Sequence, residues 1–145
     1  MKISEIMTKD PDSVNFGTSI GDVAGMMRDL DVGIIPVVRD GELRGVITDR
    51  DITIRVTAAG LGPYEASVQD FLSPNVVTIS PDADVDEARR LMSDHQIRRL
   101  MVTEDGKEDG KLVGVVSIGD IATKDSSQDT ETGEVLQDIS EPTRD

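Results

Sequence analysis

The stretch that decides the fold is GVITDRD at residues 45–51, which recurs as GVVSIGD at residues 114–120. Both copies begin with a glycine and an apolar run, which is typical of a buried strand. Both continue into a polar turn, where a Thr or Ser hydroxyl is followed three residues later by an aspartate. Two copies of this ending in a chain of 145 residues predict a duplicated structural unit.

The similarity between the two copies extends well beyond these stretches. Residues 10–52 align with residues 73–121, and the few extra residues fall in turns, among them 107–110. The aligned pairs include Pro11 with Pro74, Val14 with Val77, Ile20 with Val85, Val37 with Val102, and Gly45 with Gly114. Insertions confined to turns leave the packed elements of a duplicated fold intact. The sequence therefore predicts two similar units in tandem.

The period of the apolar residues changes in the same order within each copy. A short extended segment comes first, and apolar residues at helical spacing follow it, with Ser19 and Asp84 as the expected N-caps. Two strands come next, joined by a turn that contains Asp40-Gly41 or Asp105-Gly106, a dipeptide typical of hairpins. A second helix completes each copy. The predicted unit is strand, helix, strand, strand, helix, which is an α+β fold.

The predicted division of the chain follows from this repeat. We expect a first unit at residues 1–60, a connection and second unit at 61–124, and an acidic tail at 125–145. The tail has seven acidic residues and one arginine, a composition that predicts disorder over most of its length. Three apolar residues at helical spacing leave open a short helix docked on the body: Val135, Leu136 and Ile139.

Composition excludes several classes of function. The net charge of -14 argues against nucleic-acid binding, and three aromatic residues are too few for a base-stacking surface. No cysteine is present, one histidine alone predicts no metal site, and no catalytic constellation is recognisable. Without a signal peptide or an apolar run near the roughly 20 residues of a membrane span, we expect a cytoplasmic protein. The acidity fits either a surface suited to high salt or a protein that binds a small anion through local basic residues.

Two interpretations of the repeated ending remain open. Thr48 with Asp51, and Ser117 with Asp120, match the spacing of a capping box at the start of a helix. The box prefers Glu or Gln because the longer side chain reaches back, so Asp in both copies favours a carboxylate that faces outwards. An outward carboxylate offers two acceptor oxygens to a vicinal diol such as ribose. The glycine that begins each copy would let another group approach the strand closely.

The repeated unit, with its glycine, two apolar residues, Thr or Ser, two further residues and Asp, resembles the cystathionine beta-synthase (CBS) domain. HQIRRLMV at 95–102 followed by GKLVGVVSIGD at 110–120 is especially similar to such domains. The resemblance covers about residues 3–124 and extends to small stand-alone CBS pairs, or Bateman modules. It implies two units packed through their sheets around a pseudo-twofold axis. It also implies two clefts that bind AMP, ADP, ATP, S-adenosylmethionine or related dinucleotides.

The resemblance assigns a role to residues in each copy. The ribose hydroxyls would be held by Thr48 and Asp51 in one cleft and by Ser117 and Asp120 in the other. The adenine ring would be held by main-chain and apolar contacts at Val14, Phe16, Gly33, Ile34, Val77, Ile79 and Ile97.

The phosphate side is expected to differ between the copies. Arg98 and Arg99 occupy positions where CBS domains often place basic phosphate contacts, whereas the first copy has Gly33 and Ile34 there. The cleft reached by the arginines is therefore the predicted anion site. Alternation along a strand would point one of the two arginines to the opposite face. His95 is either a polar helix end or a further phosphate contact.

The function implied by the resemblance is a non-catalytic regulatory module that senses AMP, ADP, ATP or a related adenosyl ligand. S-adenosylmethionine or NAD are other candidate ligands, no cofactor is required, and Mg would arrive only with ATP. The ligand would favour one arrangement of the two units or of a homodimer, which an unknown regulated protein reads. A helix face with Met26, Met27, Leu91 and Met92 is an expected dimer contact. The alternative is a scaffold protein with empty clefts that acts through its dimer surface or acidic tail.

Overall fold

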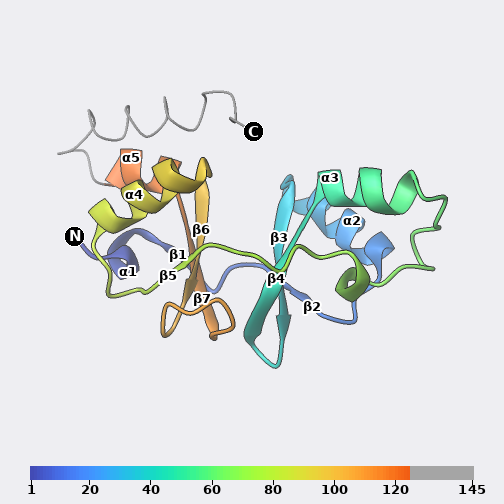
Figure 1. Ribbon diagram of the computed structural model, residues 1–145, viewed down its shortest axis with the longest axis horizontal. Coiled ribbons are helices and arrows are strands. Elements are labelled where there is room, and N and C mark those ends of the chain that lie inside the picture. Colours follow the sequence, from blue (N-terminus) through green and yellow to red (C-terminus); the bar gives the residue numbers. More distant parts are fainter. Residues whose placement is uncertain (125–145) are drawn as a thin grey trace. The chain divides into compact units, whose positions relative to one another are not determined.

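The computed structural model describes residues 1–124, so the predictions made for the tail at 125–145 lie outside the described residues. The chain forms two compact units (Figure 1). We call Asp12–Val76 the first-repeat unit. Residues 1–11 together with residues 77–124 form the second-repeat unit. Each unit has its own sheet, helices and apolar core, which confirms the predicted α+β fold.

The first-repeat unit has a three-stranded sheet in the order β2-β3-β4. Strand β2 is parallel to β3, and β3 is antiparallel to β4. Its elements are β2 (Val14–Asn15), α2 (Ile20–Leu30), β3 (Ile34–Arg39), β4 (Glu42–Thr48), α3 (Asp49–Asp51), the π-helix η1 (Ile52–Thr57) and the 3-10 helix η2 (Val68–Asp70).

The second-repeat unit has a four-stranded sheet in the order β1-β7-β6-β5. Strands β5 and β6 are parallel, whereas β1 and β6 each pair antiparallel with β7. Its elements are α1 (Ile3–Ile6), β1 (Thr8–Lys9), β5 (Thr78–Ile79), α4 (Val85–His95), β6 (Arg99–Thr103), β7 (Leu112–Ser117) and α5 (Ile118–Lys124).

The predicted N-caps of the first helix and the predicted Asp-Gly turns of the hairpin form in each copy. Ser19 Oγ accepts a hydrogen bond from Asp22 N at 3.2 Å, and the Asp84 carboxylate accepts one from Asp86 N at 2.9 Å. Asp40 and Gly41 both have positive φ, 54° and 81°, which is the conformation of a tight type I′ hairpin turn. In the second copy the extra residues at 107–110 lengthen the loop between β6 and β7.

The second helix of the first copy differs from the single helix that the repeat predicts after Thr48. After one turn of α3 the chain continues as the π-helix Ile52–Thr57. Two hydrogen bonds there span five residues, from Ala58 N to Thr53 O at 3.1 Å and from Leu61 N to Val56 O at 3.2 Å. Five of the six residues in ITIRVT are β-branched, and such side chains crowd the preceding turn of an α-helix. A wider turn relieves that crowding.

The repeated glycines lie where another backbone segment crosses the last strand of each sheet. Ser73 exchanges two backbone hydrogen bonds with Val46, at 2.8 and 3.0 Å, and a Cβ on Gly45 would clash with Ser73 O. In the other unit β1 pairs with β7, and a Cβ on Gly114 would lie 3.0 Å from Thr8 O. The group that approaches each glycine is therefore the protein's own backbone.

Each crossing segment lies at the start of one repeat in the sequence but pairs with the sheet of the other repeat. Thr8 precedes the first repeat in sequence but pairs with Val115 of the second. Ser73 begins the second repeat in the sequence but pairs with Val46 of the first. The side chains of Ile3 and Ile6 are 0% and 1% exposed in the core of the second-repeat unit. The segment at the start of each repeat is thus part of the other unit, a partition that the repeat borders in the sequence do not indicate.

The helix face proposed as an exposed dimer contact is mostly core. Met27 and Met92 are 7% and 0% exposed, and Met26 and Leu91 are partly buried against the same cores. The expectation of an exposed face was wrong because α2 and α4 use it to cover the sheet of their own unit. No helix within residues 1–124 is both long and apolar enough to span a bilayer.

A pH-dependent contribution to stability is expected from Asp84, which caps α4. The backbone hydrogen bond from Asp86 chiefly, together with the amino terminus of Met1 at 3.6 Å, lowers the pKa of Asp84 from its ordinary 3.8. A carboxyl with a lowered folded-state pKa stabilises the fold above its unfolded pKa, and this contribution is lost as the pH falls through the folded value. We expect Asp84→Asn to be less stable than wild type near neutral pH and to match it in strong acid.

Urea unfolding of both proteins at about pH 6 and about pH 2 measures this difference. The neighbouring exposed Asp82 accepts no hydrogen bond within residues 1–124, so Asp82→Asn is the matched control and should follow wild type at both pH values. A stability gap for Asp84→Asn that persists in acid would contradict the expected linkage.

Candidate functional site

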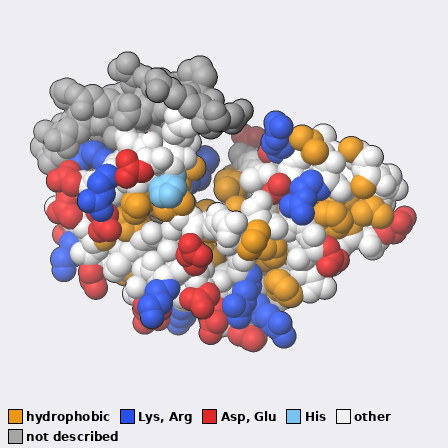
Figure 2. All heavy atoms as spheres, in the orientation of Figure 1, with side chains coloured by type: hydrophobic (Ala, Val, Ile, Leu, Met, Phe, Trp, Pro, Cys, Tyr) orange, Lys and Arg blue, Asp and Glu red, His pale blue; other side chains and the backbone are white. Residues whose placement is uncertain are grey.

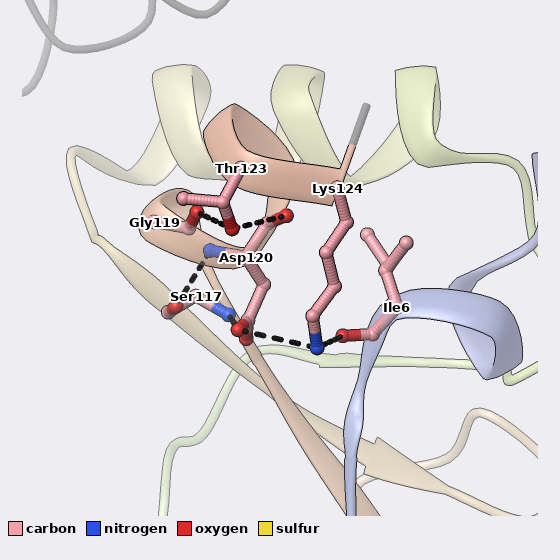
Figure 3. A network of polar contacts seen from close by, with 6 residues as sticks. All are labelled: Ile6, Ser117, Gly119, Asp120, Thr123 and Lys124. Carbon is pink, nitrogen blue, oxygen red and sulfur yellow. Dashed lines mark hydrogen bonds and ion pairs between the residues drawn. The ribbon is translucent and has the colours of Figure 1, made fainter. Parts of the chain in front are cut away.

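Both hydroxyl–aspartate pairs form complete capping boxes. Thr48 Oγ1 accepts from Asp51 N at 3.1 Å, and Asp51 Oδ2 accepts from Thr48 N at 3.0 Å. Ser117 and Asp120 repeat the arrangement at 3.1 and 2.9 Å (Figure 3). The inference that aspartate in place of Glu or Gln favours a carboxylate facing outwards was wrong for the oxygen that caps each helix. The hydroxyl residue has an extended backbone, with φ -113° and ψ 159° at Thr48, and its N–H lies within reach of the short carboxylate.

Each cap occupies only one oxygen of the carboxylate. Within residues 1–124, Asp51 Oδ1 has no hydrogen-bond or ion-pair partner. Asp120 Oδ1 lies 3.8 Å from Lys124 Nζ, and the side chain of Asp120 is 20% exposed. A carboxylate oxygen accepts up to two hydrogen bonds, so both groups retain acceptor capacity. The cap and a contact to a bound hydroxyl are compatible in the same residue.

The strand register places the start of one strand beside each pair. Ile34 is opposite Thr48, and Asp49 N donates to Gly33 O at 2.9 Å. Directly opposite residues on paired strands have Cβ atoms about 5 Å apart. The first-repeat unit therefore brings together four of the predicted site residues: Gly33, Ile34, Thr48 and Asp51.

The second-repeat unit has the same register with different side chains. Arg99 is opposite Ser117, and Ile118 N donates to Arg98 O at 2.8 Å. Both arginines are exposed, and neither guanidinium pairs with a carboxylate within residues 1–124. The structure thus places the start of β6 at Arg98 and Arg99 beside Ser117 and Asp120, and the two arginines occupy the positions of Gly33 and Ile34 in the first copy.

The residues predicted at the adenine ring are more scattered. The side chains of Val14 and Ile79 are 6% and 3% exposed and belong to the apolar cores. They lie on β2 and β5, which are edge strands, so only main-chain groups on the free edge of each strand are available to a ligand. Phe16 packs against the core beyond the end of β2, where the Arg39 guanidinium lies 5.6 Å from its ring.

Val77 and His95 line one depression of about 640 Å³ in the second-repeat unit. Its other walls are Thr78 and the loop at 106–109. His95, pale blue in Figure 2, is exposed as the last residue of α4. Ile97 is partly buried against the core of the same unit, and Ser117 and Asp120 are not among the lining residues.

Two residues near the pairs were missed by the sequence reasoning. Lys124 Nζ donates to Ile6 O at 2.9 Å beside the Asp120 carboxylate, and the Asp49 carboxylate lies against Gly33. The spacing of four residues between Asp120 and Lys124 on one helix is a signal that could have found the first. The part of the chain that the structure describes holds no group of three or more His, Cys, Asp or Glu able to bind a metal.

Comparison with known proteins agrees with the duplicated architecture. The family model of the CBS domain matches residues 3–57 and 68–127. The chain belongs to the CBS domain family. The CBS domain-containing protein YhcV of Bacillus subtilis is 36% identical over 138 residues, which are 95% of this chain and 94% of that protein.

Solved structures of CBS domain pairs share the fold. The crystal structure of Hypoxic Response Protein I with two coordinated zinc ions has a TM-score of 0.73 and 32% identity, over 84% of this chain and 97% of that one. The related hypoxic response protein 1 is from Mycobacterium tuberculosis. The CBS domain pair of protein MJ0100, in complex with 5′-methylthioadenosine and S-adenosyl-L-methionine, has a TM-score of 0.70 and 25% identity, over 88% of this chain and 98% of that one. This chain accordingly contains a tandem pair of CBS domains.

Proposed function

We propose that this CBS pair is a non-catalytic regulatory protein that binds an adenosyl compound through its two hydroxyl–aspartate pairs. The observation that carries the proposal is that each capping aspartate keeps acceptor capacity after capping its helix, and that it does so in both copies. A ribose presents two adjacent hydroxyl donors, and a carboxylate accepts such donors in charge-assisted hydrogen bonds. AMP, ADP and ATP are the expected ligands, with S-adenosylmethionine or NAD as other candidates.

Further support comes from the composition of the two sites and from a relative. The CBS domain pair of MJ0100 was crystallised with two adenosyl compounds, and it shares 25% of its residues with this chain. Arg98 and Arg99, exposed beside Ser117, are suited to phosphate groups. Thr48, Asp51, Ser117 and Asp120 are thus the proposed ribose contacts, and Arg98, Arg99 and His95 the proposed phosphate contacts.

The regulatory step is proposed to be a population shift. A ligand that binds one arrangement of the two CBS units, or of a homodimer, more tightly than another favours that arrangement. A partner protein that recognises the favoured arrangement then responds to the ligand concentration. The competing proposal is a scaffold with empty sites, in which the same surfaces contact a partner without any ligand.

Thermal unfolding with adenosyl compounds tests the proposal. A ligand at 100 times its dissociation constant should stabilise the protein by about 2.7 kcal/mol. AMP, ADP, ATP, S-adenosylmethionine and NAD should therefore include at least one compound that raises the melting temperature. If none does so at millimolar concentration, the proposal of adenosyl binding is refuted and the scaffold proposal is favoured.

Substitution at the capping aspartates separates the cap from the ligand contact. Asp51→Asn and Asp120→Asn each keep an oxygen that can accept the cap N–H but lose the negative charge. Hydrogen bonds to charged groups contribute about 1.5–3 kcal/mol, so we expect ligand affinity to fall roughly 10- to 100-fold in the variant whose site is used. Stability without ligand should change little. A role in capping alone predicts unchanged affinity in both variants, measured by calorimetric titration.

A further inference from the structure

The charges around the two hydroxyl–aspartate pairs have opposite sign. Arg99 is directly opposite Ser117, Lys124 lies beside Asp120, and Arg98 precedes Arg99 with its carbonyl bonded to Ile118 N. The first copy has no arginine at the start of β3. A Cβ on Gly33 would lie 3.0 Å from Asp49 Oδ2, so a second carboxylate occupies the space next to the position that Arg98 takes in the other copy. Arg50 is the only cation on α3. The first pair is therefore in a negative environment and the second in a positive one.

Lys124 is held in place beside the carboxylate of the second pair. Its Nζ donates to Ile6 O at 2.9 Å and lies 3.8 Å from Asp120 Oδ1 (Figure 3). Ile6 ends helix α1, and its carbonyl is one of the groups left without a partner at a helix C-terminus. The hydrogen bond fixes the ammonium group next to the oxygen that the cap leaves available.

The equivalent residue of the first copy points elsewhere. Arg55 follows Asp51 by four residues, as Lys124 follows Asp120. Arg55 Nη1 donates to Phe71 O at 2.9 Å, and the guanidinium lies 5.9 Å from the Phe71 ring. Asp51 Oδ1 consequently has no cationic partner within residues 1–124. The difference between the copies extends from the strand start to the helix that follows.

We propose that the two pairs select adenosyl compounds by charge and that Lys124 is a specificity-determining residue of the second. The pair Ser117–Asp120 takes phosphorylated adenosyl compounds such as AMP, because Arg99 and Lys124 stabilise the phosphate charge. The pair Thr48–Asp51 takes uncharged or cationic adenosyl compounds, represented by 5′-methylthioadenosine and S-adenosylmethionine, because Asp49 and Asp51 repel phosphate. Repulsion of the wrong ligand contributes to such selectivity as much as attraction of the right one. This inference rests on the proposed function.

Calorimetric titration of the full chain with AMP and with 5′-methylthioadenosine tests the assignment of the two pairs. We expect Asp120→Asn to lower the affinity for AMP roughly 10- to 100-fold and leave methylthioadenosine binding intact, and Asp51→Asn to do the reverse. The charge proposal is overturned if both compounds depend on the same aspartate, or if each variant weakens both compounds equally. If wild type binds neither these two nor any other adenosyl compound, the proposed function itself fails.

The role of Lys124 is tested by the ratio of the two affinities within one protein. Lys124→Met keeps the aliphatic stem and removes the charge, and we expect AMP affinity to fall about three- to tenfold relative to that of methylthioadenosine. The NMR signals of residues 77–124 must stay dispersed in Lys124→Met, because unfolding of the second-repeat unit alone would also lower the affinity for AMP. Lys124→Arg keeps the positive charge and should show the same ratio of AMP to methylthioadenosine affinity as the wild type.

Lys111→Met is the matched control, since Lys111 is an exposed lysine of the same unit with no ion pair within residues 1–124. It should leave the affinity ratio unchanged. Added salt should weaken AMP binding more than methylthioadenosine binding, because screening acts on the charged contacts. An equal change in the ratio for Lys111→Met and Lys124→Met, or an equal salt dependence for the two ligands, would refute a specific role for Lys124.

Discussion

Replacing Gly45 by alanine is expected to lower the free energy of unfolding of the first-repeat unit by about 3 kcal/mol. The added Cβ would fall against Ser73 O and only 2.7 Å from Leu72 Cδ1. Ser73 cannot retreat freely, because two backbone hydrogen bonds hold it to Val46. Gly45 also has φ of 156°, which residues with a side chain rarely adopt. The substitution must therefore break the crossing contact or strain the strand.

Two further glycines provide the comparison for this prediction. Gly17 has no atom within 4 Å of a Cβ and no positive φ, so Gly17→Ala should leave stability nearly unchanged. Gly114→Ala should be intermediate, since its Cβ would meet the flexible Met7 side chain at 2.5 Å and Thr8 O at 3.0 Å. Urea unfolding followed by NMR signals of each unit measures the three changes. Equal stability of Gly45→Ala and Gly17→Ala would show that the crossing segment adapts without cost.

Deletion of residues 1–9 is expected to unfold the second-repeat unit while the first stays folded. The deletion removes Ile3 and Ile6, which are 0% and 1% exposed in the core of the second-repeat unit. It also removes β1, the edge strand paired with β7. Loss of a buried isoleucine side chain costs about 2–5 kcal/mol, and two such losses approach the 5–15 kcal/mol of a typical domain. The effect falls on the repeat that begins some 70 residues later in the sequence.

Two-dimensional NMR of the truncated chain gives the result for each unit separately. Signals from residues 77–124 should collapse towards random-coil positions, and those from 12–76 should stay dispersed. Lys9→Ala in the full chain is the control for a side chain in the removed segment, because Lys9 is exposed and its backbone pairing is retained. Loss of the signals from 12–76 instead would mean that the first sixty residues form one unit, as the repeat borders in the sequence predict.

The elements that depend on local signals could be predicted from the sequence. Apolar spacing indicated α2 and α4, the Asp-Gly dipeptides indicated the hairpins, and Ser19 and Asp84 were recognised as caps. The duplicated hydroxyl and aspartate were recognised as a possible capping box and a possible ligand contact, because the spacing of three residues allows both. The π-helix after Asp51 was not foreseen, since the apolar pattern of a helix does not distinguish a wider turn.

The features of the candidate site that depend on position within the repeat could be predicted from the sequence. The features that depend on long-range contacts could not. The register that places Arg99 beside Ser117 follows from the hairpin, which local sequence specifies. The side chains around each aspartate, by contrast, are not specified by the local sequence. Lys124 is fixed beside Asp120 by a carbonyl 118 residues away, and Arg55 is drawn away from Asp51 by Phe71.

The sequence by itself determined the duplication, the order of elements in each copy and the two pairs of polar residues, because each is written in residues close together in the chain. Only the tertiary structure decided which backbone lies against Gly45 and Gly114, and which unit contains residues 1–11. The physical reason is that a glycine in a strand indicates that another group packs closely against the backbone, but not which segment of the chain that group belongs to. Pairing of Thr8 with Val115 and of Ser73 with Val46 depends on the path of the whole chain.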